Sequence, residues 1–184
     1  MPTRITASVQ RLLNRLANTP VAVFDATNTL VVANAPYDAF MVDSSSARGI
    51  ERNTVWRHLV GNGSRVIHSP DEQAVFERQL VADLRMTASR YPADRSVRKL
   101  VADLSAPSPR FVELWESDLP VRLNEPSKHK VVDHPEVGRI ALDCDALLVA
   151  GDDLRILVYT AEPGTEDAER LALAVVLGTQ ALVD

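Results

Sequence analysis

The sequence predicts a two-layer α+β domain, in which a five-stranded antiparallel sheet is covered by helices on one face. Three observations predict this fold class. Apolar residues recur at helical spacing through the middle of the chain and at every second position in the run 130–160. The predicted elements follow one another as helix, two strands, several helices, three strands and a last helix. The 184 residues are 46% hydrophobic and 24% charged, which fits one folded domain.

The first predicted helix covers residues 4–17 and is amphipathic. Its apolar face consists of five residues at helical spacing: Ile5, Val9, Leu12, Leu13 and Leu16. A second stripe consists of Arg4, Arg11 and Arg15. Two interpretations of this stripe stay open, a face in contact with water and a connector to a DNA-binding partner.

A hairpin follows, with strands at 21–25 and 30–34 around the turn 26–29. The first strand is apolar on both faces, so we expect it at the centre of the sheet. Asn34 is expected to cap a short helix over 35–42, and a polar loop over 43–50 comes next.

The middle of the chain is predicted to be helical. A helix over 53–60 ends at the Gly61-Asn62-Gly63 run. Ser69-Pro70-Asp71-Glu72 has the pattern of a capping box, so a long helix is expected from there to about Tyr91. A helix over 94–105 and another that Ser108 caps complete this region.

The second half of the sheet is predicted as an antiparallel meander. Val121 and Leu123 alternate before a turn at 124–127, and strands are expected at 130–134, 139–148 and 154–160. A last helix begins after Thr165 and is apolar on every side from Leu171 to Leu177. It is too short to cross a bilayer, so it is either an oligomer interface or buried within one subunit.

Composition excludes several classes of protein. The 25 acidic residues exceed the 20 Lys and Arg, giving a net charge of −5, and nucleic-acid binding by this chain alone needs a basic face. Cys144 is the single cysteine, which excludes an internal disulfide and a multi-cysteine zinc site. The chain shows neither the apolar core of a secretion signal nor a run near 18 apolar residues, so we expect a cytoplasmic protein without membrane contact.

The spacing of the histidines, acids and cysteine in the sequence indicates neither a catalytic site nor a metal site. His129 and His134 lie five positions apart on a predicted strand and therefore on opposite faces. Asp143 and Asp145 share a strand face, and Cys144 points to the other. We therefore expect no metal, no cofactor and no enzyme, since no set of acid, base and nucleophile converges.

Aromatic residues point instead to a cavity. Large apolar side chains on short helices above a curved sheet can leave a pocket, and the same side chains can also form a filled core. The candidate ligand-binding residues are Phe24, Tyr37, Phe40, Trp56, Phe76, Leu80, Leu84, Phe111, Trp115 and His134. The polar groups expected near a ligand head group are Arg57, Arg85, Arg122 and His134.

Several short sequence motifs occur in an order and at a spacing typical of one family: Glu51-Arg52-Asn53, the run 90–115, 134–138, Leu142-Asp143 and 159–164. Over roughly residues 19–177 the chain resembles the ligand-binding domain of MmyB-like transcription regulators. The resemblance implies a PAS-like domain that binds small apolar effectors, fatty acids being the known kind. It also implies an N-terminal helix-turn-helix of the XRE type that contacts DNA. Ala33 and Glu72 stand where the family often has tryptophan.

Taken with the resemblance, residues 1–18 are expected to be a connector helix and 19–184 a PAS-like ligand-binding domain. The hypothesis is an effector sensor, forming a homodimer, that binds a small apolar ligand such as a fatty acid. It would reach DNA through a helix-turn-helix that this chain lacks, since the chain begins about where that module would end. The alternative is a ligand-free dimerisation or interaction module with a filled core.

Overall fold

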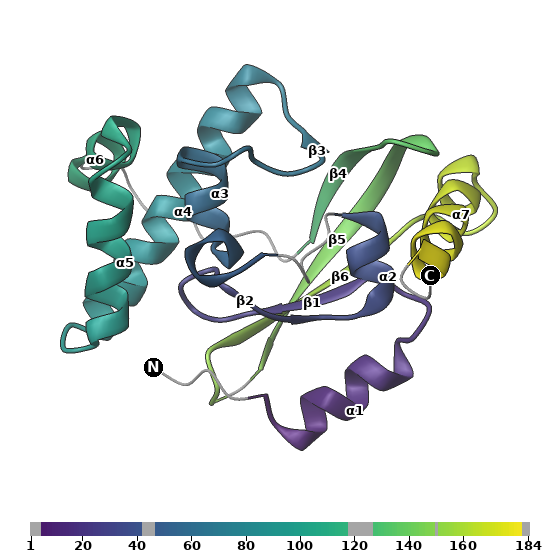
Figure 1. Cartoon of the computed structure of the whole chain (residues 1–184), viewed down its shortest axis with the longest axis horizontal. Coiled ribbons are helices and arrows are strands. Elements are labelled where there is room, and N and C mark those ends of the chain that lie inside the picture. Colours follow the sequence, from purple (N-terminus) through teal and green to yellow (C-terminus); the bar gives the residue numbers. More distant parts are fainter. Residues whose placement is uncertain (1–4, 42–46, 118–126, 150, 182–184) are drawn as a thin grey trace.

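A curled antiparallel sheet with the strand order β2-β1-β6-β5-β4-β3 forms the centre of the computed structural model (Figure 1). The structure describes residues 5–41, 47–117, 127–149 and 151–181. The strands are β1 (Val21–Phe24), β2 (Leu30–Ala33), β3 (Val66–Ile67), β4 (Ser127–His134), β5 (Gly138–Val149) and β6 (Leu154–Thr160). The helices are α1 (Ala7–Arg15), α2 (Ala35–Phe40), α3 (Thr54–Leu59), α4 (Pro70–Arg90), α5 (Arg95–Ser105), α6 (Pro109–Glu116) and α7 (Glu166–Ala181), with a 3-10 turn η1 (Gly49–Arg52).

The predicted α+β class and antiparallel sheet are confirmed, but the prediction of five strands is wrong. In the described chain the sheet has six strands, because β3 pairs with β4 through Val66↔Val132 and Ile67↔Val131. Two residues are too few to show a period in the sequence. Three predicted features lie outside the described residues. They are the alternation at Val121 and Leu123, the turn up to residue 126, and residues 42–46 of the predicted helix end and loop.

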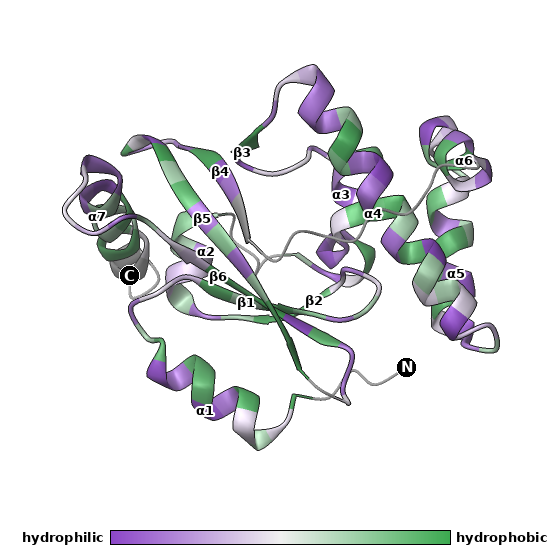
Figure 2. Ribbon diagram, turned by 180° about the vertical axis from the view of Figure 1, so that it is seen from behind, coloured by the Kyte–Doolittle hydropathy of each residue, from purple (hydrophilic) through white to green (hydrophobic). Residues whose placement is uncertain are grey.

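Both faces of the sheet are covered, which corrects the expectation of helices on one face. Val9 and Leu13 of α1 pack with Val21 and Val23 of β1 on one side. On the other side, Ala22 lies in a core with residues of α2 and α7. All four residues of β1 are buried, as the apolar character of both faces predicts. Figure 2 shows hydrophobic residues along β1 and alternating hydrophobic and hydrophilic residues along α1.

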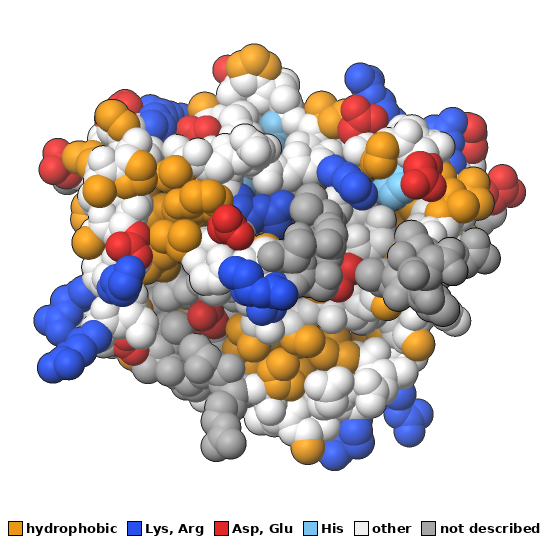
Figure 3. All heavy atoms as spheres, in the orientation of Figure 1, with side chains coloured by type: hydrophobic (Ala, Val, Ile, Leu, Met, Phe, Trp, Pro, Cys, Tyr) orange, Lys and Arg blue, Asp and Glu red, His pale blue; other side chains and the backbone are white. Residues whose placement is uncertain are grey.

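The basic stripe of α1 faces water in its described part. Arg11 and Arg15 are exposed, whereas Arg4 lies outside the described residues. Figure 3 shows basic side chains that project from the side of the molecule where α1 lies. The exposure of these two arginines fits both interpretations of the stripe, a water-facing surface and a connector to a DNA-binding partner.

Asn34 joins three elements, and its predicted role as an N-cap is confirmed. Its Oδ1 accepts from Tyr37 N at 3.1 Å, at the start of α2, and from Val21 N at 2.9 Å, at the start of β1. Its Nδ2 donates to the carbonyl oxygens of Leu16 and Thr19 at 3.1 and 2.8 Å, just after α1. One short polar side chain thus fixes how α1, β1 and α2 meet.

The helical middle forms a second core beside the sheet. Its fully or nearly fully buried residues are Val55, Leu80, Val81, Leu84, Leu104, Phe111 and Leu114. The predicted capping box at the start of α4 is confirmed, because Ser69 N donates to Glu72 Oε2 at 2.8 Å and Glu72 N to Ser69 Oγ at 3.4 Å. Figure 1 shows α4, α5 and α6 to one side of the sheet, away from α7.

α7 packs on α2 at close range. A Cβ added at Gly178 would lie 2.2 Å from Ala39 Cβ, so only glycine allows this approach. Ala174 is fully buried in the same core, whereas Leu173 and Val176 are each 50% exposed. One side of the apolar run 171–177 is thus buried within the subunit, and its outer side is not.

Candidate functional site

A cavity of about 390 Å³ lies between the sheet and the helices α3 and α4. This volume falls in the range of small-molecule binding sites, roughly 300–1,000 Å³. The floor of the cavity is formed by alternate residues of the paired strands β5 and β6. Alternate residues of a strand face the same side of the sheet. The register places Cys144 opposite Tyr159, Ala146 opposite Leu157 and Leu148 opposite Arg155, and all six side chains line the cavity.

Four of the ten predicted ligand-binding residues line this cavity: Phe24, Tyr37, Phe76 and Leu80. They come from β1, α2 and α4, so the structure brings together residues that are far apart in the sequence. Phe24 and Leu80 are at least nine-tenths buried, and Phe76 is half-buried.

The other six predicted residues lie elsewhere. Leu84 and Phe111 are fully buried in the helical core, and Trp56 and Trp115 pack against that core. Phe40 is fully buried above the sheet, with its ring centroid 5.7 Å from that of Tyr159. Helical periodicity identifies an inward face, but it does not tell which of two interiors that face meets.

His134 is buried at the end of β4 and binds backbone groups on both ring nitrogens. Its Nδ1 accepts from Glu136 N at 3.3 Å, which leaves Nε2 to donate to Ala39 O at 3.2 Å. It therefore links β4 to α2 and does not line the cavity. Arg85 donates to the carbonyl of Ser117, also away from the cavity, and Arg122 lies outside the described residues.

The charge of the cavity wall is mainly positive. Three cationic side chains line it, Arg57, Lys130 and Arg155, against the single carboxylate of Asp83. Arg155 pairs with Asp83 at 3.4 Å. Within the described residues Arg57 and Lys130 form no ion pair; Arg57 Nε donates to Gly63 O at 3.3 Å, and Lys130 Nζ lies 5.4 Å from the ring centroid of Tyr159. Arg57 thus lines the cavity, and its position near a ligand head group stays a prediction.

Two tyrosines provide neutral polar groups on the wall. Burial raises the pKa of Tyr37 and that of Tyr159 well above the ordinary value for a phenol. Their rings are 5.8 Å apart between centroids. Both side chains therefore stay uncharged at any ordinary pH.

Two histidines that the sequence did not single out lie at the α3–β3 side of the cavity. The ring of Phe76 lies 4.9 Å from that of His58 and 5.0 Å from that of His68, between centroids. Burial, and after it the neighbouring His68 and Arg57, lower the pKa of His58 from 6.5 to about 4. His58 is therefore a neutral, mainly aromatic part of the wall near pH 7.

This lowered pKa predicts a pH-dependent stability. The unfolded chain takes up a proton on His58 at its ordinary pKa of 6.5, and the folded chain only near 4. The contribution of His58 to the free energy of unfolding is therefore fully present above pH 6.5. It is lost as the pH drops towards 4, and the loss amounts to about 2–3 kcal/mol. His58→Phe keeps the aromatic contact and should remove this contribution to the pH dependence of stability. Urea unfolding at a series of pH values between 7 and 4 measures it.

The control for that prediction is His129→Gln. His129 is exposed and lies away from the cavity, so its replacement should leave the dependence of stability on pH almost as in the wild type. Parallel stability curves for the wild type and His58→Phe would contradict the prediction.

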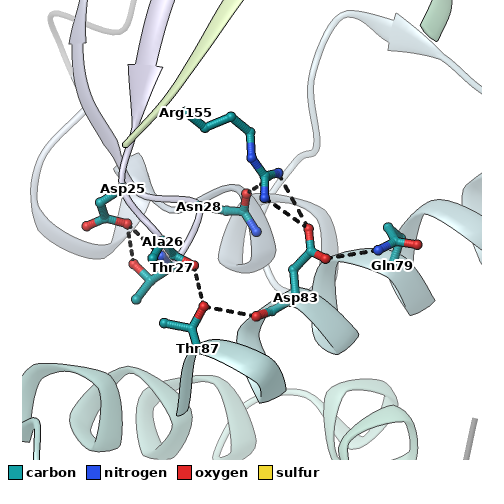
Figure 4. A network of polar contacts seen from close by, with 8 residues as sticks. All are labelled: Asp25, Ala26, Thr27, Asn28, Gln79, Asp83, Thr87 and Arg155. Atoms are coloured by element: carbon teal, nitrogen blue, oxygen red, sulfur yellow. Dashed lines mark hydrogen bonds and ion pairs between the residues drawn. The ribbon is translucent and has the colours of Figure 1, made fainter. Parts of the chain in front are cut away.

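A network of polar contacts closes the cavity at the hairpin turn (Figure 4). Asp83 of α4 accepts from Gln79 Nε2 at 2.9 Å and from both terminal nitrogens of Arg155 at 3.4 Å. Arg155 Nη1 also donates to Asn28 Oδ1 at 3.3 Å. One turn further along α4, Thr87 Oγ1 donates to the carbonyl of Ala26 at 2.6 Å.

The turn itself is rigid because Asp25 satisfies its backbone. Its Oδ1 accepts from Thr27 N at 2.8 Å, Thr29 N at 3.0 Å and Thr27 Oγ1 at 2.6 Å. This turn holds Asn28 in a left-handed conformation with φ at 60°. α4 is thus tied to the hairpin and to β6 at one edge of the cavity.

Sequence reasoning missed Asn28, Asp83 and Arg155, although two of them left a signal. Asp83 lies on the inward stripe of α4 with Leu80 and Leu84, so a charged residue falls on an apolar face. Arg155 shares a strand face with Leu157, where the alternation predicts an apolar residue. A charge at a buried position is unusual enough to indicate a paired or functional group.

Within the described ranges, His, Cys, Asp and Glu residues nowhere form a group of three or more that could hold a metal ion. Nor does the described part of the chain contain a helix that is long and apolar enough to span a membrane.

Residues 5–174 match the family described as the MmyB-like transcription regulator ligand binding domain. The chain belongs to this family. The match extends through α1, which the sequence resemblance over roughly 19–177 did not include. No protein with a curated description matches the sequence. Members of the family are regulatory domains that bind a small-molecule effector, so the prediction that this MmyB-like domain is not an enzyme is confirmed.

Proposed function

We propose that this MmyB-like domain senses a small, mainly apolar ligand with an acidic head group, such as a fatty acid, in the cavity between the sheet and α4. The observation that carries the proposal is a mainly apolar cavity wall with two cations, Arg57 and Lys130, that have no carboxylate partner in the described residues. A carboxylate head group supplies that partner, and the alkyl chain covers Phe24, Phe76 and Leu80.

The fold assignment that goes with this proposal is PAS-like. The five strands in the order β2-β1-β6-β5-β4 and the helices laid over them support it. The division into a connector, 1–18, and a sensor, 19–184, is part of the same proposal. α1 then passes a change in the sensor to a helix-turn-helix of the regulator, which contacts DNA in the cytoplasm.

A route from the cavity to α1 and α7 supports this transmission. Tyr37 lines the cavity and belongs to α2, whose first residues Asn34 ties to the end of α1. α2 also packs on α7, where Ala39 meets Gly178. A ligand shifts this arrangement only by its difference in affinity between two states of the protein.

The proposal predicts a regular dependence of affinity on chain length. Each buried CH₂ contributes about 0.8 kcal/mol, so the Kd should fall about three- to fourfold for each added carbon until the cavity is full. Isothermal titration calorimetry with saturated fatty acids from C8 to C16, supported by native mass spectrometry, measures this. No binding across the whole series would contradict the proposal.

A matched pair of variants keeps the test specific. Ala146 faces the cavity, and the next residue, Leu147, is on the other face and 50% exposed. Ala146→Phe should fill the cavity and weaken binding at least tenfold, and Leu147→Phe should leave it unchanged. Equal affinities of the two variants would place the fatty acid outside the cavity.

Homodimerisation is part of the sensor proposal, and it is also the basis of the alternative function, a dimerisation or interaction module without a ligand. The specific observation in its favour is Leu173 on the outer side of α7, which is 50% exposed. Calorimetry with dodecanoic acid separates the two functions, because only the sensor binds the acid, and sedimentation of the chain reports whether it dimerises.

A further inference from the structure

Asn28 carries a buried hydrogen-bond donor that the protein leaves unused. The residue lines the cavity and is only 6% exposed. Its Nδ2 has no hydrogen-bond partner among the described residues, although it is buried. A buried amide hydrogen without an acceptor is costly, so its persistence calls for an explanation.

The orientation of the Asn28 amide follows from its neighbour. Arg155 has only donors, and its Nη1 lies 3.3 Å from Asn28 Oδ1. Exchanging the oxygen and nitrogen of the amide would place two donors against each other, so Oδ1 must face Arg155. Nδ2 then points into the space between the hairpin turn and α4, as Figure 4 shows.

Asp83 supplies an acceptor on the far side of that space. Its side chain is 6% exposed, lines the same cavity, and is held by Gln79 and Arg155. The cavity therefore has a donor and a carboxylate acceptor at one end. The apolar side chains of Met86 and Leu148 line it as well.

We propose that Asn28 and Asp83 form a specificity site for a hydroxyl group on the ligand. A hydroxyl accepts one hydrogen bond and donates another, so it takes the hydrogen of Asn28 Nδ2 and gives its own to Asp83. A carbonyl oxygen, which only accepts, would face the carboxylate unfavourably. This inference rests on the proposed function and narrows the ligand to hydroxylated apolar acids.

The test compares dodecanoic acid with its complete set of monohydroxy isomers, from C2 to C12, by isothermal titration calorimetry. At least one isomer should bind the wild type about tenfold more tightly than the unsubstituted acid, because it satisfies the buried donor. The readout is the ratio of the two dissociation constants.

Asn28→Asp is the decisive variant. Aspartate tolerates the left-handed backbone at φ 60° and keeps an oxygen towards Arg155, but it removes the donor. The added charge weakens the binding of both acids alike, so only the ratio of their dissociation constants is compared. This ratio should fall to about one. Asn28→Gly, which also adopts this φ, serves as the second variant, and the exposed Asn14→Asp on α1 is the matched control that keeps the ratio.

The outcomes separate this inference from the proposed function. If no acid binds, hydroxylated or not, both are overturned. If dodecanoic acid binds and no isomer binds more tightly, only the hydroxyl site is overturned. A preference that persists in both Asn28 variants would also overturn it, because the hydroxyl would then be recognised elsewhere.

Discussion

Replacing Phe111 by alanine is expected to lower the free energy of unfolding by about 3–5 kcal/mol. The side chain is fully buried in the helical core, and its ring is stacked on that of Trp115 with centroids 5.4 Å apart. Its removal leaves a cavity that α4 and α6 cannot fill without shifting. Urea unfolding measures the loss as a lower midpoint at an unchanged slope.

The control is the same substitution at Phe76, which is half-buried at the wall of the cavity. Phe76→Ala should cost clearly less stability and weaken fatty-acid binding. Phe111→Ala should keep the affinity of the folded protein. The prediction fails if Phe111→Ala costs less than about 1 kcal/mol or if it weakens binding as much as Phe76→Ala does.

Arg155→Met is expected to lower the free energy of unfolding by about 3 kcal/mol. The side chain of Asp83 is only 6% exposed, and the substitution removes its cationic partner. A buried carboxylate that loses its countercharge costs more than the ion pair itself contributes. Arg155 is 27% exposed and 3.4 Å from Asp83, so the effect belongs at the lower end of the range for buried pairs.

The double variant Asp83→Leu with Arg155→Met tests the reason for that loss. Replacing both charges by apolar side chains removes the unpaired carboxylate, so most of the lost stability should return. A double-mutant cycle from thermal or urea unfolding gives the coupling directly. Losses that simply add would show that the two charges do not stabilise each other.

Local signals predicted the elements of this fold well. Asn34, Ser69 and Ser108 each cap the helix expected from them, because the donor and acceptor of a cap lie within three residues. The apolar character of both faces of 21–24 likewise indicated a strand buried on two sides.

Contacts between distant segments explain most of what the sequence did not predict. β3 is defined by its pairing with β4, more than sixty residues later, and has almost no pattern of its own. The predicted binding residues divide in the same way. Leu80 and Leu84 share the inward stripe of α4 and both lie in the helical core, yet Leu80 also lines the cavity and Leu84 does not.

The polar end of the cavity shows the same limit. Asn28, Asp83 and Arg155 come from a turn, a helix and a strand, and the position of Asn28 depends on the turn held by Asp25. In the sequence they are three unrelated polar residues. The charges of Asp83 and Arg155, at positions where the pattern predicts apolar residues, were the sign that partners were needed.

A crystal structure of the chain grown with dodecanoic acid tests the central claim most directly. Difference density should run through the cavity along Phe24, Phe76 and Leu80, with the carboxylate at Arg57 or Lys130. A cavity without such density, or one closed by side chains while the acid lies on the surface, would contradict the account.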